Sequence, residues 1–190
     1  MDEQEIIKGC LRNDRNCQKA LYEQYYSRML VVCMRYAKNR DEAKDMFQEG
    51  MIKVFDNLKN FGSKGSFEGW IRKIMTNTAI DHLRRNKHEY LIVNTVYASE
   101  VLHGNRQEEE NVDDDEIIFK LKPDQVMEAV QKLTPAYRTV FNLHVMEEMT
   151  HKEIAELLDI SEGTSKSNFS KAKFNLRKHL TNLISKVPKE

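Results

Sequence analysis

Basic and hydroxyl-bearing side chains gather near the C-terminal end of the chain, where they could donate hydrogen bonds to an anionic partner. The segment DISEGTSKSNFSKAK, from Asp159 to Lys173, combines loop-forming Ser and Gly residues with apolar residues at helical spacing. The predicted helix keeps Phe169, Ala172 and Leu176 on its inward stripe. The predicted outward face carries Lys166, Ser167, Ser170 and Lys171, with Asn168 towards its edge. Lysine, serine and asparagine can donate to base edges and phosphates, so this face would fit DNA.

A helix-turn-helix is predicted to hold this face. Thr150 and Glu153 have the spacing of a capping box, which begins a short helix that ends near Leu158. After a turn at Asp159, Ser161 caps the next helix. A short helix, a turn and a second helix with a basic face are typical of DNA-binding modules. A plain helical packing unit with a solvated basic face is the alternative, and this pattern alone leaves it open.

A second group of polar residues lies on a predicted helix over residues 41–60. Its apolar stripe runs from Ala43 to Leu58 at helical spacing, and Asp45, Gln48 and Glu49 lie together on the other side. Taken alone, such an edge is what any solvated helix presents.

Aromatic and basic residues follow one another in FGSKGSFEGWIRKIMTNTAIDHLRRNK. Single-stranded DNA binding needs this combination, because bases stack on rings while phosphates meet Lys or Arg. The alternative places Phe67, Trp70 and Ile74 in the core, and for Trp70 we favour the core.

The helices that would position these groups fall into two blocks. Residues 1–88 show helical periodicity almost throughout, whereas residues 89–122 contain GNRQEEENVDDDE and predict an acidic linker. The helices predicted in the two blocks cover residues 13–38, 41–60, 67 onward, 124–133, 135–147, 150–158 and 161–180. The predicted fold class is all-α, with two small helical domains (1–88 and 123–190) joined by a flexible acidic linker, the C-terminal domain being a helix-turn-helix.

Charge alternates in sign along the chain, although the formal net charge is zero. Residues 64–88 carry roughly +4, residues 98–120 roughly −6 and residues 160–190 roughly +5. Such asymmetry indicates anionic partners. It also suggests that the acidic tether partly covers the basic faces in the free protein; a passive solvated tether is the alternative.

Composition excludes several classes of protein. A hydrophobic content of 40% is too high for a disordered chain. No apolar run approaches the ~20 residues of a membrane span, and the acidic N-terminus lacks the order of a signal peptide, so we expect a cytoplasmic protein without membrane insertion. The chain has an odd number of cysteines, and no two of them have C-x-x-C spacing. We therefore interpret Cys10, Cys17 and Cys33 as small apolar residues, buried or half-buried, and not as disulfide or metal ligands.

Catalysis and cofactors are not expected. The chain has no cluster of acidic metal ligands, no Ser/His/Asp set and no phosphate-binding glycine loop, and FGSKGS lacks the G-x-x-x-x-G-K pattern.

Three motifs in order resemble one family. They are DMFQEGMIKVFDNLKNF, FEGWIRKIMTNTAIDHLRR and LTPAYRTVFNLHVMEEMTHKEIAELLDISEGTSKSNFSKAK. The chain resembles the extracytoplasmic-function sigma factors, the small class of sigma-70-like proteins, over most of residues 13–85 and 123–178. This resemblance implies a promoter-recognition subunit that binds core RNA polymerase, recognises the −10 and −35 elements, assists promoter melting and is controlled by an anti-sigma factor.

The resemblance also implies roles for individual residues. Asp45, Gln48 and Glu49 would bind the clamp helices of the large polymerase subunit. The pocket for a base flipped from the −10 element would be formed by Gly62, Ser63, Lys64, Gly65, Ser66 and Phe67. The −10 strand and its phosphates would be held by Arg72, Lys73, Asn77, Arg84 and Arg85, while Asp81 would pair with Arg84 or Arg85. In the −35 element, the candidate base readers are Lys166, Ser167, Asn168, Ser170 and Lys171, and the candidate phosphate contacts are Thr150, Lys152 and Lys173.

The chain departs from the family pattern in the last helix. Ser165 stands where an apolar residue is common, and Lys166 and Asn168 stand where arginines are common. A serine weakens the inward stripe, and lysine cannot make the bidentate fork that arginine offers to guanine. The −35 sequence is therefore not predicted. A stand-alone helix-turn-helix regulator, whose N-terminal domain senses a ligand or dimerises, is the alternative function; it has no need of the edge at Asp45, Gln48 and Glu49.

Overall fold

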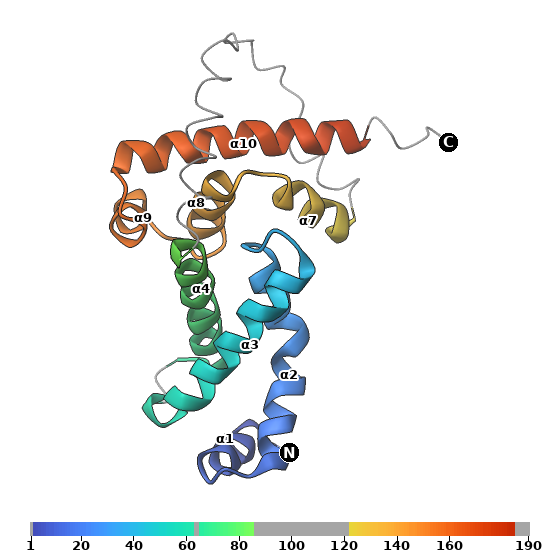
Figure 1. Ribbon diagram of the computed structural model, residues 1–190, viewed down its shortest axis with the longest axis vertical. Helices are drawn as coiled ribbons and strands as arrows, with labels where there is room; N and C mark the ends of the chain where they lie inside the picture. The colour runs from blue at the N-terminus through green and yellow to red at the C-terminus, as the bar shows by residue number, and fades with distance from the viewer. Residues whose placement is uncertain (1, 63–64, 86–121, 185–190) are drawn as a thin grey trace. The chain divides into compact units, whose positions relative to one another are not determined.

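The computed structural model describes residues 2–62, 65–85 and 122–184, and every regular element in these ranges is a helix (Figure 1). The chain divides into two compact units, Met1–Arg85 and Asn86–Glu190, called unit 1 and unit 2 below. The predicted all-α class with two helical parts is confirmed. The predicted linker at 89–122 lies outside the described residues except for Lys122, which caps α7. Its proposed covering of the basic faces also lies outside them, as do Ser63 and Lys64.

Unit 1 is a set of packed helices. Its elements are α1 (Glu3–Leu11), α2 (Arg15–Met34), α3 (Arg40–Asn57), the short 3-10 helix η1 (Leu58–Asn60) and α4 (Phe67–Arg85). Helices α2, α3 and α4 pack against one another, and α1 packs against α2. Helix α1 was not predicted as a separate element. It ends because Asn13 adopts a left-handed conformation with φ of 60°, after which Asp14 caps α2 by accepting from the backbone nitrogen of Asn16 at 2.8 Å.

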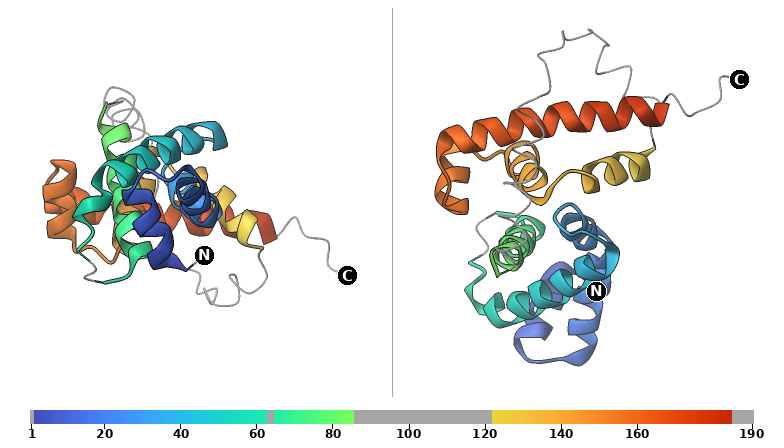
Figure 2. Two further views of the ribbon diagram at one scale, coloured as in Figure 1. Left: turned by 90° about the horizontal axis from the view of Figure 1, so that it is seen from below. Right: turned by 45° about the horizontal axis from the view of Figure 1, so that its top comes forward.

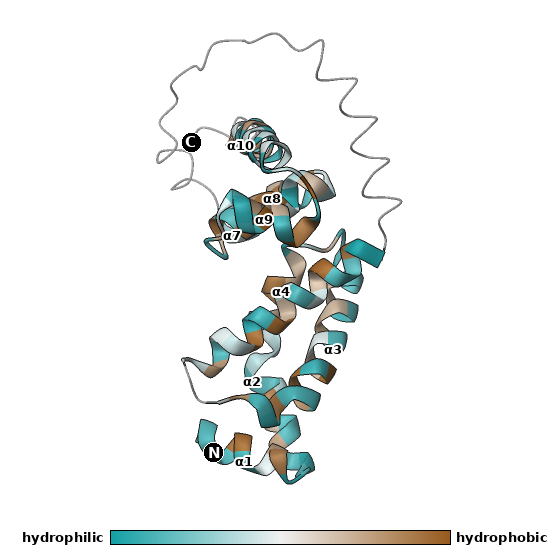
Figure 3. Cartoon of the chain, turned by 90° about the vertical axis from the view of Figure 1, so that its left-hand side faces the viewer, coloured by the Kyte–Doolittle hydropathy of each residue, from teal (hydrophilic) through white to brown (hydrophobic). Residues whose placement is uncertain are grey.

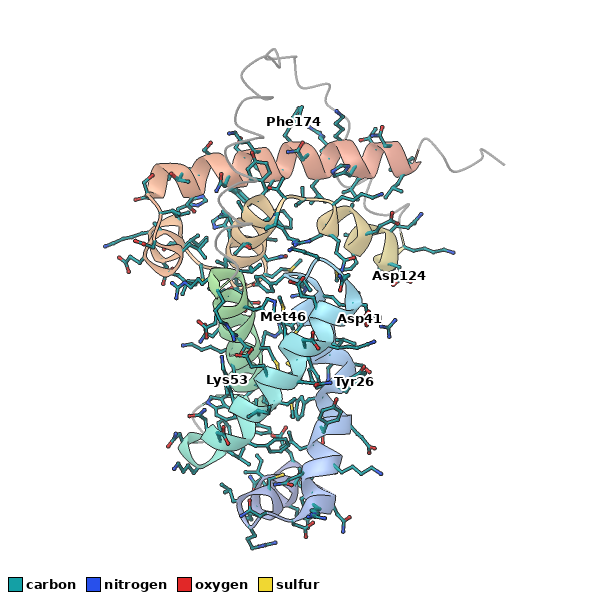
Figure 4. All side chains as sticks on the ribbon, in the orientation of Figure 1. Tyr26, Asp41, Met46, Lys53, Asp124 and Phe174 are labelled. Carbon is teal, nitrogen blue, oxygen red and sulfur yellow. The ribbon has the colours of Figure 1, made fainter. Side chains whose placement is uncertain are left out.

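The apolar stripe of α3 forms the centre of unit 1, as predicted. Ala43, Met46, Phe47 and Val54 are fully buried. Figure 4 shows Met46 on the inner side of α3, whereas Asp41 lies on its outer side. Hydrophobic and hydrophilic residues alternate along the helices (Figure 3). One buried face therefore determines which side chains of α3 remain on the surface.

Unit 2 is built on one long helix. Its elements are α7 (Pro123–Gln131), α8 (Pro135–Val145), α9 (His151–Leu158) and α10 (Glu162–Ile184). Helix α10 packs against the other three (Figures 1 and 2). It runs past the predicted end near Leu180, because Leu180, Leu183 and Ile184 pack around Ala129 of α7.

The predicted helix-turn-helix is formed by α9 and α10. The Thr150 hydroxyl accepts from the backbone nitrogen of Glu153 at 3.3 Å, and the Glu153 carboxylate accepts from the backbone nitrogen of Thr150 at 2.8 Å. Asp159 ends α9 in the left-handed region with φ of 56°. The hydroxyl of Ser161 then accepts from the backbone nitrogen of Thr164 at 2.9 Å, which caps α10. The starts of both helices are thus set by local hydrogen bonds that the sequence makes possible, and the end of α9 by the left-handed conformation of Asp159.

Two stacked histidines lie where α8, α9 and α10 meet. The rings of His144 and His151 are 4.5 Å apart between centroids, with an angle of 17° between their planes, and both lie beside Phe169. His144 Nδ1 donates to the Met149 carbonyl oxygen at 2.8 Å. His151 Nδ1 lies 3.0 Å from the hydroxyl of the fully buried Ser165. The serine that was expected to weaken the inward stripe therefore has a polar partner in the interface.

The glycine at position 9 sets how closely α1 approaches α2, and its substitution tests that contact. A Cβ added to Gly9 would lie 2.7 Å from Cys17 Cβ and 2.1 Å from Cys17 Sγ. Because Cys17 Cβ is fixed to the backbone, Gly9→Ala should force α1 away from α2 and lower the free energy of unfolding by about 1–3 kcal/mol. Thermal unfolding followed by circular dichroism measures this. Gly163→Ala is the control, since its nearest neighbour would lie at 3.7 Å. A Gly9→Ala protein with unchanged unfolding would show that the helices are not in close contact.

Acid should destabilise unit 2. Burial, the neighbouring His144 and Lys166 lower the pKa of His151 below 6.5, although Glu162 opposes this. Burial, Lys132 and Lys178 likewise lower the pKa of His179. The unfolded chain therefore binds more protons than the folded chain in this pH range. The free energy of unfolding has its full value above the ordinary pKa of 6.5 and falls as the pH drops through the folded pKa values.

We expect urea denaturation of the full chain to show lower stability at about pH 5 than at about pH 7.5. The double variant His151→Gln, His179→Gln should reduce this difference, because neither position can then take up a proton. An equal pH dependence in the wild-type chain and the variant would contradict the assignment to these histidines.

Candidate nucleic-acid interface

The polar edge of α3 is largely exposed. Asp45 and Gln48 are exposed, and Glu49 is half-buried. Ile52, which is 61% exposed, follows on the same side at a spacing of seven residues from Asp45. Ile52 was not among the predicted site residues, although its spacing from Asp45 could have indicated it.

The structure brings together residues from two predicted groups. Nη2 of Arg85 donates to both carboxylate oxygens of Glu49, at 2.8 and 2.7 Å. Nζ of Lys53 lies 3.2 Å from Glu49 Oε1. Arg85 therefore holds the pKa of the Glu49 carboxyl below its ordinary value, with Lys53 as a smaller cause. The candidate polymerase contact on α3 and a candidate DNA contact on α4 form one ionic cluster.

The predicted pairing of Asp81 along its own helix is wrong. Its carboxylate lies 3.2 Å from Nζ of Lys53 on α3. Arg85 directs its guanidinium to Glu49, and the bond that it donates to Asp81 goes to the carbonyl oxygen, at 3.4 Å, not to the carboxylate. The packing of α3 against α4 places Lys53 within reach, and sequence spacing cannot show this. Arg84 is exposed at the end of α4.

The remaining candidates for the −10 element lie along α4 and the loop before it. Lys73 and Asn77 are exposed, whereas Arg72 is half-buried and lies 3.8 Å from Glu68. Gly62, Gly65 and Ser66 are exposed loop residues. Gly65 has φ of 93°, a conformation that suits glycine. The Ser66 hydroxyl accepts from the backbone nitrogen of Gly69 at 3.0 Å and so caps the start of α4.

Phe67 lies in the core rather than in an open pocket. It is 3% exposed, and its ring stacks on Trp70 with a centroid distance of 5.7 Å and meets Phe61 at 4.9 Å. Tyr25 also packs on this ring edge to face. The prediction that the ring of Phe67 is open to a flipped base is therefore wrong. Trp70 and Phe61 are the half-buried rings of this cluster. Phe61 was not among the predicted site residues, although it directly precedes the glycine loop.

Most candidates for the −35 element lie on the open side of α9 and α10. Lys166, Ser167, Ser170, Lys173, Thr150 and Lys152 are exposed, and Lys171 is half-buried. Nζ of Lys166 lies 2.7 Å from Glu162 Oε1, and this pair holds the pKa of Glu162 low. The ammonium of Lys173 lies 5.1 Å from the centre of the Phe169 ring. The basic face is therefore present, with two of its lysines held by neighbours.

Asn168 does not belong to that face. It is 7% exposed and lies on the inward side of α10, between Ser165 and Ala172. The prediction that it stands at the outward edge is corrected. Asn168 follows Ser165 by three residues and precedes Ala172 by four, so all three residues face the other helices of unit 2.

The described residues were also compared with the geometry of metal sites and membrane spans. Across residues 2–62, 65–85 and 122–184 no cluster of three His, Cys, Asp or Glu residues could hold a metal ion. None of the helices described is long and apolar enough to cross a membrane. All three cysteines are free and buried, as predicted. Burial raises the pKa of Cys10 to about 11 and that of Cys33 to about 12, so both thiols are protonated at neutral pH.

Comparison with known proteins identifies both units. Residues 21–89 match the family model for sigma-70 region 2, and residues 124–175 match that for sigma-70 region 4, so the two models together match more than half of the chain. The ECF RNA polymerase sigma factor SigW of Bacillus subtilis is 27% identical over 179 residues, which are 93% of this chain and 96% of that protein. The RNA polymerase sigma-H factor of Pseudomonas aeruginosa is 24% identical over 184 residues, or 96% of this chain and 95% of that protein.

Among solved structures, the sigma factor RpoE of Bartonella quintana, crystallised with the anti-sigma factor NepR, aligns with a TM-score of 0.48 at 16% identity, covering 86% of this chain and 96% of that one. The family assignment rests on the sequence matches, in which the two regions occur in order along one chain. The chain belongs to the sigma-70 family, as an extracytoplasmic-function sigma factor.

Proposed function

We propose that this protein is a promoter-recognition subunit of bacterial RNA polymerase that acts in the cytoplasm and has no catalytic activity of its own. The observation that carries the proposal is the exposed basic face of α10 within a helix-turn-helix. Ser167 and Ser170 lie at the centre of this face, with Lys166 at its side. Side chains of this kind can reach base edges in the major groove of the −35 element.

The start of α9 supplies the phosphate contacts in this proposal. Thr150 and Lys152 are exposed at the N-terminal end of α9, where the Lys152 ammonium and the Thr150 hydroxyl can meet a phosphate. Lys173 of α10 adds a third positive or polar group. Contacts with phosphates fix the register of the protein on DNA and make binding dependent on salt.

Unit 1 would bind the melted −10 strand along α4. Lys73, Asn77 and Arg84 are exposed along this helix and can meet phosphates and base edges. The loop at Gly62–Ser66 would receive the flipped base. Since Phe67 is buried, the half-buried rings of Phe61 and Trp70 are the nearest stacking surfaces.

Core RNA polymerase would bind the outer side of α3. Asp45 and Gln48 are exposed there, and Glu49 adds a carboxylate at the edge. An anti-sigma protein that covers the outer faces of α3 and α10 completes the set of partners in this proposal.

Transcription from a random promoter library tests the proposal. Core polymerase with this protein should select promoters that share two separated sequence blocks, and transcription should stop when the protein is left out. Asp45→Lys should abolish the selection, because it reverses a charge on the polymerase face. A protein that fails to co-elute with core polymerase, and on which transcription does not depend, is not a sigma factor; duplex binding without polymerase would then favour the stand-alone regulator.

The contact between Glu49 and Arg85 makes a separate prediction about the free chain. In the structure, Arg85 is occupied by Glu49 and so is not available to a phosphate. Glu49→Gln should release Arg85, strengthen binding of single-stranded oligonucleotides, and steepen the plot of log affinity against log salt by about 0.7. Fluorescence anisotropy over a range of salt concentrations measures both effects.

Two further variants complete this test. The double variant Glu49→Gln, Arg85→Gln should bind no better than Arg85→Gln alone, because the released group is then missing. Asp41→Asn is the matched control on the same helix, since Asp41 pairs with Lys44 of its own helix. An unchanged salt slope in Glu49→Gln would show that Arg85 does not contact the strand.

A further inference from the structure

The most exposed large hydrophobic side chain in the described residues lies on α10. Phe174 is 68% exposed and points away from the rest of unit 2 (Figure 4). Single hydrophobic residues scattered over a surface need no explanation. Phe174 differs because of its position: it follows Ser170 by four residues and Ser167 by seven, so all three lie on one side of the helix.

The surroundings of Phe174 are basic and polar. Helix α10 contains one acidic residue, Glu162, and that residue pairs with Lys166 at 2.7 Å, three turns before Phe174. Lys171 and Lys178 lie on the same side of the helix, one turn on either side of the ring. A partner for this face must therefore offer negative charge at its edges and an apolar group at its centre.

The major groove of duplex DNA meets both requirements. Its rims carry phosphates, and its floor carries the 5-methyl group of each thymine, which apolar side chains can contact. We propose that Phe174 is a specificity-determining residue that contacts a thymine methyl group in the −35 element. This inference rests on the proposed binding of α10 to that element, but it adds a reader that neither the motifs nor the family resemblance assigns.

Helix geometry places the thymine. Phe174 lies about 6 Å along the helix from Ser170, at a rise of about 1.5 Å per residue. The thymine should therefore lie farther along the groove than the base that Ser170 reaches, towards the C-terminal end of α10.

Removal of single methyl groups tests the proposal. The probe is the selected −35 duplex, in which each thymine is replaced in turn by deoxyuridine, the same base without its methyl group. Binding of the full chain in complex with core polymerase is measured by competition for each duplex. One replacement should weaken wild-type binding about three- to fivefold, because a buried methyl is lost, and should have no effect on Phe174→Ala. Val145→Ala, an exposed apolar residue of α8 that is 44% exposed, is the matched control and should keep the wild-type response.

The outcomes separate this inference from the proposed function. If no replacement weakens binding, or if Phe174→Ala keeps the same sensitivity, the contact does not exist even though the duplex is bound and transcribed. If Phe174→Ala instead lowers affinity for polymerase or for a protein partner without changing the response to uracil, the ring belongs to a protein interface and the inference fails. If the duplex is not bound by the wild-type complex, the proposed function itself fails. Unfolding of Phe174→Ala should match the wild-type chain, because the side chain is exposed.

Discussion

Burial of one side of α10 is the constraint on which unit 2 depends. Ser165 and Ala172 are fully buried and Leu180 nearly so, and together they hold α10 against α7, α8 and α9. Because a helix turns by about 100° per residue, fixing this side also fixes which residues remain outside. The polar and basic residues at 166, 167 and 170 are exposed for this reason. The same burial removes Asn168 from the surface and presents Phe174 instead.

Unit 1 follows the same rule with a different consequence. The buried stripe of α3 leaves Asp45, Gln48 and Ile52 on its outer side. Where α3 meets α4, however, the surface residues of the two helices are not independent, because Arg85 binds Glu49 and Lys53 bridges Glu49 and Asp81. An exposed ion pair of this kind contributes little to stability. The pair does, however, connect the candidate polymerase contact on α3 with the candidate DNA contact on α4, which helical spacing does not connect.

Much of the fold could be predicted from the sequence, because helix boundaries depend on local chemistry. The capping box at Thr150 and Glu153, and the serine cap at Ser161, are visible as residue types at fixed spacing. The stripe of α3 is visible as periodicity. The separation of α1 from α2 was not predicted. It depends on the left-handed conformation of Asn13, which the residue type alone does not determine. The roles of the predicted site residues remain a proposal. Helical spacing predicted that Lys166, Ser167 and Ser170 face outward, whereas the ion pairs between α3 and α4 could not be predicted.

The sequence by itself determined the helical class, the helix-turn-helix, the order of its motifs and so the family, because these follow from periodicity, caps and residue types along the chain. Only the tertiary structure decided which candidates have a free side chain. Phe67 is buried because Tyr25, Phe61 and Trp70 pack around it, and these residues come from different elements. Asp81 pairs with Lys53, 28 residues away, rather than with its own helix. Such contacts depend on how helices pack, and a rule based on spacing within one helix cannot contain them.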